Sequence, residues 1–395
     1  MMVAAQHKKN KRRVIPTRVF YLLGLSMYIF YSFLQTTLFS TIVPNVVFSL
    51  FKYGCLLLFS LSILTAKFSK QQILVVLFGV LLAILVFHNS GDSSALILIV
   101  FLLSSLNNDL STVVRIYFVI ALALTLGTIG SSLLGIIDNY SYVVNGSTRW
   151  AFGFLYTTDF AAHIFYLCLV FAYLVRKHIN ILYSLLPTLI GLVVFYFTRA
   201  KLDTILMIVI TVALLFYKYG KLEILKKGRL IISSTPFIMA IVSVGLSIAF
   251  MPNNGLFSAV DRVLTNRLAM GHLALYEYPI KFFGQYISQN GSGGLSFQTG
   301  LTSTGTNLSY FFIDSSYIKM LLAFGVVFFL IYLFGLSRTI YLNLISDKYM
   351  MPIILVIFCV SSVIDQHMLE VAYNPFLICI VTTQFWRHER LAVKK

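Results

Sequence analysis

Residues 230–250 read LIISSTPFIMAIVSVGLSIAF, without one charged side chain, and they lead into a polar interval at residues 252–310. A helix needs about 20 mostly apolar residues to cross the hydrocarbon core of a bilayer. The run at 230–250 therefore predicts a membrane-spanning helix. The interval after it is the only long polar one in a chain that is 59% hydrophobic, so we expect one large loop outside the bilayer.

The composition of the whole chain points to the same fold class. Only 11% of the 395 residues are charged, whereas soluble domains carry about 25%. We expect an all-α polytopic membrane protein in which residues 1–395 form a single integral membrane domain with about 12 transmembrane helices. The twelve apolar segments lie at residues 19–39, 42–64, 72–87, 94–106, 113–137, 158–175, 179–197, 203–217, 230–250, 316–336, 350–364 and 371–385. The fourth has only 13 residues, and its loss would invert every later span.

The distribution of charge predicts the orientation of these spans, because cytoplasmic loops accumulate Lys and Arg. With the N-terminus inside, 22 basic and four acidic residues face the cytoplasm, against seven basic and nine acidic residues outside. The net charge of +17 is then a sign of topology and not of nucleic-acid binding. We expect a multi-pass protein of the cell membrane with both termini cytoplasmic and a long extracytoplasmic loop at residues 251–315.

The seven outer basic residues oppose the orientation rule, and an anionic ligand would explain them. They are Arg149, Arg199, Lys201, Arg262, Arg267, Lys281 and Lys319. Arg149 precedes Trp150 in an aromatic and glycine-rich stretch, which suits a phosphate with sugar rings nearby or simple interfacial anchoring. Arg199 and Lys201 share a short turn in which a surface ion pair to Asp203 would contribute only about 0–1 kcal/mol.

The long loop has two parts of different character. Residues 261–278 place apolar side chains at helical spacing and predict an amphipathic helix on the membrane surface. Arg262 and Arg267 would lie about 140° apart around its axis, so one can pair with Asp261 while the other faces a ligand. His272 is either a polar contact at the rim or a catalytic residue. The second part consists of Gly284 and the Gly/Ser/Thr-rich run at 289–307. Its composition predicts a flexible flap.

Acidic residues occur at two other outer positions. Asp314 opens the segment at 316–336, where it can be a helix N-cap. Asp365, His367 and Glu370 cluster in the last outer turn with a spacing that could bind a metal, but no second cluster supports this and we expect no metal site. The four cysteines lie in apolar runs and indicate neither disulfides nor zinc. The chain contains no DxD, HExxH, GxGxxG or P-loop pattern, so we expect no cofactor and no nucleotide chemistry.

Three of these patches resemble the O-antigen polymerase and ligase superfamily, specifically the Wzy-type polymerases of capsular and exopolysaccharide clusters. Residues 149–154 with Asp159 are similar to the arginine and FGF patch of the family. Residues 198–200 resemble its Ser-Arg turn, and residues 267–284, followed by 314–317 and Gly325, resemble its long outer loop and next helix. The resemblance covers residues 149–330, and it departs from the family pattern at Asp159, where Asn is usual, and at Met270, where Trp is common.

The resemblance implies an architecture like that of GT-C lipid-linked glycosyltransferases and an activity that joins undecaprenyl-diphosphate-linked oligosaccharide units into polysaccharide. It implies membrane lipids, a flippase and a chain-length regulator as partners, and no nucleic acid. The implied site residues are as follows: Arg149, Arg199, Arg267, Lys201 and Arg262 for the diphosphate, Trp150, Asp159 and Tyr317 for sugars, and Asp314 or His272 as general base.

Two alternatives remain open. A ligase of the same superfamily would transfer a finished glycan to a different acceptor. A non-enzymatic flippase for lipid-linked oligosaccharide would be expected to show internal repeats and charges at mid-membrane. The sequence shows no repeat, and only Lys52 is central in a predicted span.

Overall fold

The computed structural model describes residues 2–144, 146–264, 266–290 and 311–382, and most of them are helical. Within this part, eight helical segments are long and apolar enough to cross a membrane. They are α1 (Met2–Leu34), α3 (Asn45–Thr65), α4 (Lys70–Ser90), α6 (Leu110–Leu133), α7 (Thr157–Val175), α8 (Ile181–Thr198), α9 (Lys201–Tyr219) and the run Ser316–Ile345, which comprises α16 (Ser316–Lys319), η2 (Met320–Phe324) and α17 (Gly325–Ile345). The prediction of an all-α membrane protein is confirmed.

Three shorter apolar helices also match predicted spans: α5 (Ser93–Ser104), α12 (Thr235–Ala249) and α18 (Met350–Ser361). The described part of the twelfth predicted segment contains only the 3-10 helix η4 (Pro375–Ile380), so a total of twelve spans stays a prediction. The remaining elements are α2 (Phe39–Ile42), η1 (Ser105–Asn107), β1 (Ser141–Val144), β2 (Ser147–Trp150), α10 (Glu223–Lys227), α11 (Arg229–Ser233), α13 (Gly255–Val263), α14 (Arg267–Glu277) and η3 (His367–Leu369).

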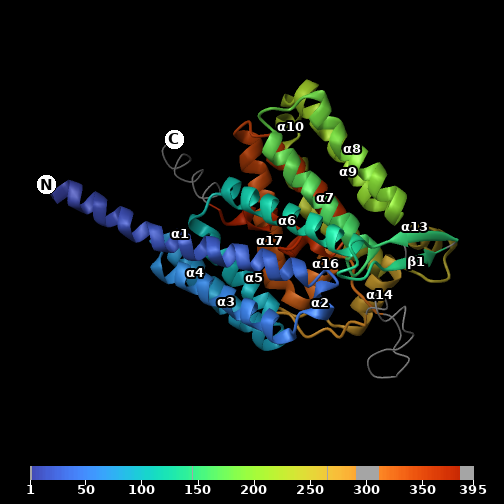
Figure 1. The fold of residues 1–395 in the computed structure, drawn as a ribbon, viewed down its shortest axis with the longest axis horizontal. Coiled ribbons are helices and arrows are strands. Elements are labelled where there is room, and N and C mark those ends of the chain that lie inside the picture. The colour runs from blue at the N-terminus through green and yellow to red at the C-terminus, as the bar shows by residue number, and fades with distance from the viewer. Residues whose placement is uncertain (1, 145, 265, 291–310, 383–395) are drawn as a thin grey trace.

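The helices form two groups joined by α6 and the C-terminal segment (Figure 1). The first group contains α1, α3, α4 and α5, in which α1 packs on α3 and α5 packs on both α3 and α4. The second contains α7, α8 and α9, and α6 contacts both α1 and α7. η4 packs against α6 and α17. The fully buried Tyr117 of α6 donates a hydrogen bond to the carbonyl of Ala372 at 2.9 Å, which fixes the segment before η4.

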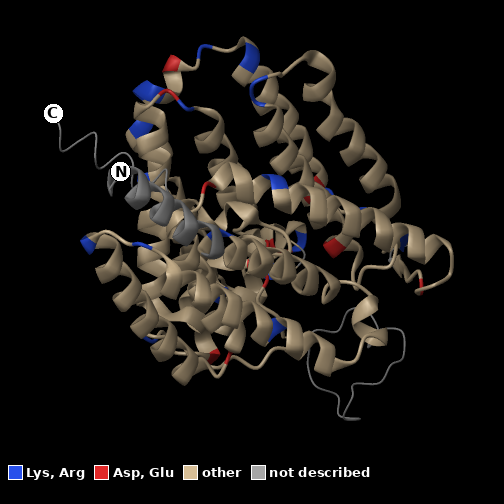
Figure 2. Cartoon of the chain, turned by 60° about the vertical axis from the view of Figure 1, so that its left-hand side comes forward, with Lys and Arg blue, Asp and Glu red and all other residues tan. Residues whose placement is uncertain are grey.

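The connections between helices gather at two ends of the bundle. At one end, α1 meets the end of α3 through a 3.0 Å hydrogen bond from Thr17 to Thr65, and Gln72 of α4 bonds to Asn107 at 3.1 Å. The opposite end carries the β1–β2 hairpin, the α8–α9 turn, α13 and α14 (Figure 1), and residues 362–374 bond to the start of α16. Figure 2 shows Lys and Arg positions gathered at one edge of the molecule, and both acidic and basic positions near its centre.

The helix in the long loop is divided in two. The first helix, α13, ends at Val263, and Asn266, with a φ of 66°, is the N-cap of α14, so α13 and α14 replace the single amphipathic helix predicted for residues 261–278. The Asp261 carboxylate accepts hydrogen bonds from the N–H groups of Leu268 and Ala269 at 2.9 and 3.1 Å. Asp261 therefore caps α14, and the predicted pairing with an arginine is wrong.

The run Ser316–Ile345 is interrupted where the long loop approaches it. η2 is a π-helical turn, and Gly325 after it has a φ of 87°. The N–H groups of Val326 and Val327 donate to the carbonyls of Lys281 and Phe282, each at 3.1 Å. Gly284 faces this break with a φ of 79°, and a Cβ on Gly284 or Gly325 would overlap the opposing backbone. Gly284 thus belongs to a packed contact between two backbones and not to the predicted flap, most of which lies outside the described residues.

Candidate functional site

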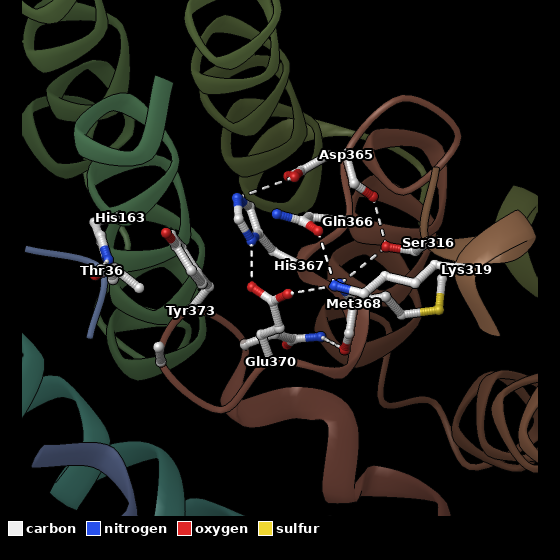
Figure 3. Close-up of polar contacts among 12 residues, drawn as sticks. Thr36, His163, Ser316, Lys319, Asp365, Gln366, His367, Met368, Glu370 and Tyr373 are labelled. Carbon is white, nitrogen blue, oxygen red and sulfur yellow. Dashed lines mark hydrogen bonds and ion pairs between the residues drawn. The ribbon is translucent and has the colours of Figure 1, made fainter. Parts of the chain in front are cut away.

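The centre of the polar site is His367, in the connection that follows α18. Its Nε2 lies 3.2 Å from the Asp365 carboxylate and its Nδ1 lies 2.6 Å from the Glu370 carboxylate (Figure 3). The His367 side chain is only 8% exposed. Because a carboxylate accepts hydrogen bonds, both ring nitrogens carry hydrogen when both contacts form, and the ring is an imidazolium.

Lys319 extends this cluster from the start of the long helix. Its ammonium group lies 3.0 Å from the second oxygen of Glu370 and donates to the Gln366 side chain at 2.8 Å. Glu370 therefore bridges Lys319 and His367, and the four groups form a continuous line from Asp365 to Lys319. We call Asp365, His367, Glu370 and Lys319 the polar relay.

The pKa values in the relay follow from burial and from these neighbours. Burial lowers the pKa of His367, but Asp365 and Glu370 outweigh it and raise the pKa to about 9. Burial raises the pKa of Glu370, but Lys319 and His367 outweigh it and bring the pKa to about 2. Burial raises the pKa of Asp365, and His367 and Arg267 counter only part of that effect. The relay is thus charged at neutral pH around His367 and Glu370, with Asp365 as its most basic carboxylate.

Backbone contacts hold the relay against the long helix. The N–H of Ser316 donates to the carbonyls of Ser362 and Asp365, each at 3.1 Å, and its hydroxyl also donates to the Asp365 carbonyl. Met368 returns a hydrogen bond from its N–H to the Ser316 hydroxyl at 3.1 Å. Asn374 donates to the Met368 carbonyl at 2.8 Å. The start of α16 and residues 362–374 are therefore one hydrogen-bonded unit.

A stack of three rings connects the relay to α7. Tyr373 lies between His367 and His163, and the ring centroids are 3.6 and 3.9 Å from those of the two imidazoles (Figure 3). The hydroxyl of Thr36 donates to the Phe33 carbonyl at 2.7 Å, so at its 2.8 Å contact with His163 it accepts a hydrogen from Nε2. This leaves Nδ1 of His163 as an acceptor, and it is buried without a hydrogen-bond partner among the described residues.

A second ion pair lies in the same electrostatic field. Arg267, at the start of α14, places Nε 3.3 Å from the Asp314 carboxylate, and each side chain is 22% exposed. Arg267 also lowers the pKa of Asp365, so the pair and the relay interact electrostatically. Ser315, and not Asp314, caps α16 by accepting from the N–H of Ile318. The interpretation of Asp314 as an N-cap is therefore wrong.

Three other predicted residues lie on β2 and at the start of α7. Asp159, in the first turn of α7, helps to raise the pKa of His367. Arg149 lies on β2, opposite Tyr142 in the hairpin, and its Nε is buried without a partner in the described part of the chain. Trp150, next to Arg149, is 38% exposed.

Several other predicted residues form no hydrogen bond or ion pair with the relay in the part of the chain that the structure describes. Arg199 and Lys201 are exposed at the α8–α9 turn, where the guanidinium of Arg199 lies 5.6 Å from the Phe195 ring. Arg262 is exposed on α13. His272 and Tyr317 are bonded to other helices. Nδ1 of His272 bonds to the Ser247 carbonyl at 2.8 Å, and the fully buried Tyr317 donates to the Cys359 carbonyl at 2.9 Å.

Comparison with protein-family models, curated proteins and solved structures gives no match for this chain. The site is therefore interpreted from its own chemistry. No group of His, Cys, Asp or Glu side chains suited to a metal ion occurs in the described residues. In the relay, both nitrogens of His367 already face carboxylates, which leaves neither as a metal ligand.

Part of this site is predictable from the sequence, but its centre is not. Asp365, His367 and Glu370 were visible as a cluster, but only as a weak metal motif. Lys319 was visible as one of the outer basic residues. No local pattern connects these residues, because the contact arises from the packing of residues 362–374 on α16. His163 and Tyr373 lie within apolar segments and carry no local signal of a polar site.

Proposed function

We propose that the protein is a membrane glycosyltransferase that polymerises undecaprenyl-diphosphate-linked oligosaccharide units into capsular or exopolysaccharide on the outer face of the cell membrane. One observation carries this proposal: the cations Arg267, His367 and Lys319 each pair with a carboxylate toward one end of an apolar helix bundle, and both His367 and Arg267 lower the pKa of Asp365. A lipid-diphosphate donor presents its phosphates at that level while its polyprenyl chain stays in the membrane.

The reaction needs a cation where the diphosphate leaves. The acceptor hydroxyl oxygen forms a bond to the anomeric carbon, the bond from that carbon to the diphosphate oxygen breaks, and the diphosphate takes the electron pair. Arg267 is the proposed partner for this charge, with Arg149 as a second cation because its Nε is buried without a partner among the described residues. Removing one such donor typically costs about 3–4 kcal/mol of transition-state stabilisation.

The acceptor hydroxyl also has to lose a proton. Asp365 is the proposed general base because His367 holds one carboxylate oxygen while the other, Oδ2, is buried and bonded to nothing in the described part of the chain. Burial raises the pKa of Asp365, and a base is most effective when its pKa approaches the working pH. Asp314 is the second candidate. His272 is not a candidate, because its Nδ1 is bonded to the Ser247 carbonyl of α12.

The decisive experiment is transfer by the purified protein with a synthetic undecaprenyl-diphosphate oligosaccharide and no nucleotide sugar. We expect a ladder of products differing by one repeat unit on a gel. Arg267→Ala and Arg149→Ala should abolish long products in the assay and in cells, with normal protein abundance. Lys227→Ala is the matched control, since Lys227 is an exposed cation at the opposite end of the bundle. Full-length polymer from both arginine variants would refute the role of these cations.

The buried relay also favours a second candidate function. Linked carboxylates and imidazoles inside a membrane protein are typical of proton-coupled carriers, so the chain could move a lipid-linked oligosaccharide across the bilayer. Proteoliposomes separate the two functions. A carrier would move a labelled lipid-linked unit in response to a pH gradient without chain growth, whereas the polymerase would lengthen the glycan without a gradient.

A further inference from the structure

A cavity of about 370 Å³ lies at the end of the bundle opposite the polar relay, between α1, α3, η1 and α6. Its volume falls in the range of about 300–1,000 Å³ that is typical of small-molecule sites. Two cations and several hydroxyl groups contribute to its lining, which includes Arg18, Lys67, Thr17, Thr65, Thr112 and the fully buried Tyr21.

The wall of this cavity is held by hydrogen bonds between different helices. Thr17 donates to Thr65 across α1 and α3 at 3.0 Å. The Asn107 side chain donates to the Lys67 carbonyl at 3.1 Å and accepts from Gln72 at 3.1 Å. The cavity is therefore a built feature held by hydrogen bonds between helices, and not a gap between loose side chains.

The depth of the cavity identifies the environment of its ligand. The apolar windows of α1 and α6 begin at Thr17 and Leu110, and that of α3 ends at Thr65. All three apolar segments thus terminate beside the cavity, at the level where lipid phosphates lie. The sequence before Thr17 also contains the basic run KKNKRR at residues 8–13, which attracts an anionic leaflet.

The charges suit a phosphate. Arg18 is exposed and has no ion pair within the described residues. Lys67 contributes a second cation to the lining. Among the described residues of the lining, Asp109 alone is acidic, and it accepts a hydrogen bond from the N–H of Thr112 and caps α6. The partial positive charge of that helix end offsets the charge of Asp109, so the cations dominate.

We propose that this cavity binds the phosphodiester headgroup of an anionic membrane lipid, with Arg18 and Lys67 on the phosphate and the acyl chains along α1 and α3. The site is independent of the proposed transfer reaction and lies at the other end of the bundle. Inorganic phosphate offers the same charge but lacks acyl chains, and it separates a lipid site from a site for a free anion.

The test is a titration of the full-length protein in detergent with phosphatidylglycerol, followed by native mass spectrometry. We expect one tightly retained lipid and much weaker retention of phosphatidylcholine. Arg18→Gln with Lys67→Gln should weaken phosphatidylglycerol binding by roughly 25-fold, about fivefold for each cation. The control, Arg115→Gln with Lys177→Gln, removes two exposed cations from the same end that do not line the cavity.

A substitution that leaves every charge in place controls for misfolding and for a general effect of charge. Ala66→Phe fills part of the cavity without removing a cation, and it should also release the lipid while the melting temperature without lipid stays unchanged. The proposal fails if both double variants weaken binding equally, if phosphatidylcholine binds as well as phosphatidylglycerol, if Ala66→Phe retains the lipid, or if millimolar inorganic phosphate displaces it.

Discussion

Tyr373 lies parallel to His367, with ring centroids 3.6 Å apart and an interplanar angle of 18°. The other face of Tyr373 is covered by His163 of α7, again at 18°. The stack places an aromatic face against the charged imidazole, which is a favourable cation–π arrangement. It also connects the C-terminal segment to a helix about 200 residues away in the sequence, so the relay depends on α7 as well as on α16.

The stack predicts different effects for two substitutions of Tyr373. Tyr373→Phe keeps both ring contacts, whereas Tyr373→Leu removes them. We expect the leucine variant to be about 1–3 kcal/mol less stable than the phenylalanine variant, since each aromatic pair contributes about 0.5–1.5 kcal/mol. Thermal unfolding of the two purified variants measures the difference, and equal melting temperatures would show that the stack is not stabilising.

The raised pKa of His367 predicts a loss of stability at alkaline pH. A histidine whose pKa is about 9 when folded and about 6.5 when unfolded stabilises the fold fully below pH 6.5 and loses that contribution as the pH rises through 9. The loss is on the order of 3 kcal/mol. The free energy of unfolding of His367→Gln should not change with pH between about 6.5 and 9. That of His272→Gln should fall with pH as it does in the unmodified protein. Glu370, with a folded pKa of about 2, acts only at acidic pH.

A charge exchange at Arg267 and Asp314 separates folding from catalysis. Arg267→Asp places two carboxylates together, and we expect a loss of about 1 kcal/mol of stability as well as loss of transfer. Adding Asp314→Arg restores an ion pair and most of the stability, but it moves the cation away from α14. Stability by thermal unfolding and chain length by gel should therefore diverge in the double variant. Recovery of long products would show that Arg267 only stabilises the fold.

Asp365→Asn tests the proposed base. We expect transfer to fall by about 10²–10⁴-fold, because an amide cannot take the proton from the acceptor. In the unmodified protein the transfer rate should rise with pH through the raised pKa of Asp365, because the active carboxylate form appears there. This rising limb of the pH–rate profile should be absent in Asp365→Asn. If Asp314→Asn removes the limb and Asp365→Asn leaves it, the roles of the two carboxylates are reversed.

Gly325→Ala and Gly284→Ala should each destabilise the protein. The positive φ alone costs about 1–3 kcal/mol for a residue with a Cβ, and overlap with the facing backbone adds to it. Gly127→Ala is the control, because Gly127 lies inside α6 with open space around its Cα, where alanine is the better helix former. A melting temperature for Gly325→Ala equal to that of the control would contradict the close backbone contact.

Much of the fold could be predicted because bilayer thickness and apolar run length constrain the spans directly. The segment at 371–385 illustrates the limit. An apolar stretch is equally suited to a span and to a buried irregular segment, and Asn374 and Pro375 begin a 3-10 helix there. The break at Asn266 was likewise invisible, since it depends on Asp261 reaching the N–H groups of α14.

The site was harder to predict than the fold because its members are distant in the sequence. Arg267 and Asp314 were predicted from their positions outside the membrane, but their ion pair was not. Lys319 and Glu370 meet only because Ser316 binds the Asp365 backbone. Such contacts are set by tertiary packing, which no local pattern encodes.

The contact between Lys281–Phe282 and Val326–Val327 consists of backbone hydrogen bonds, so it depends little on which side chains these residues carry. Distant homologues could therefore change nearly every residue around it and still preserve the same architecture. We expect such homologues to share little overall identity with this chain and to be recognised by two glycines, one in the long loop and one in the helix that follows it.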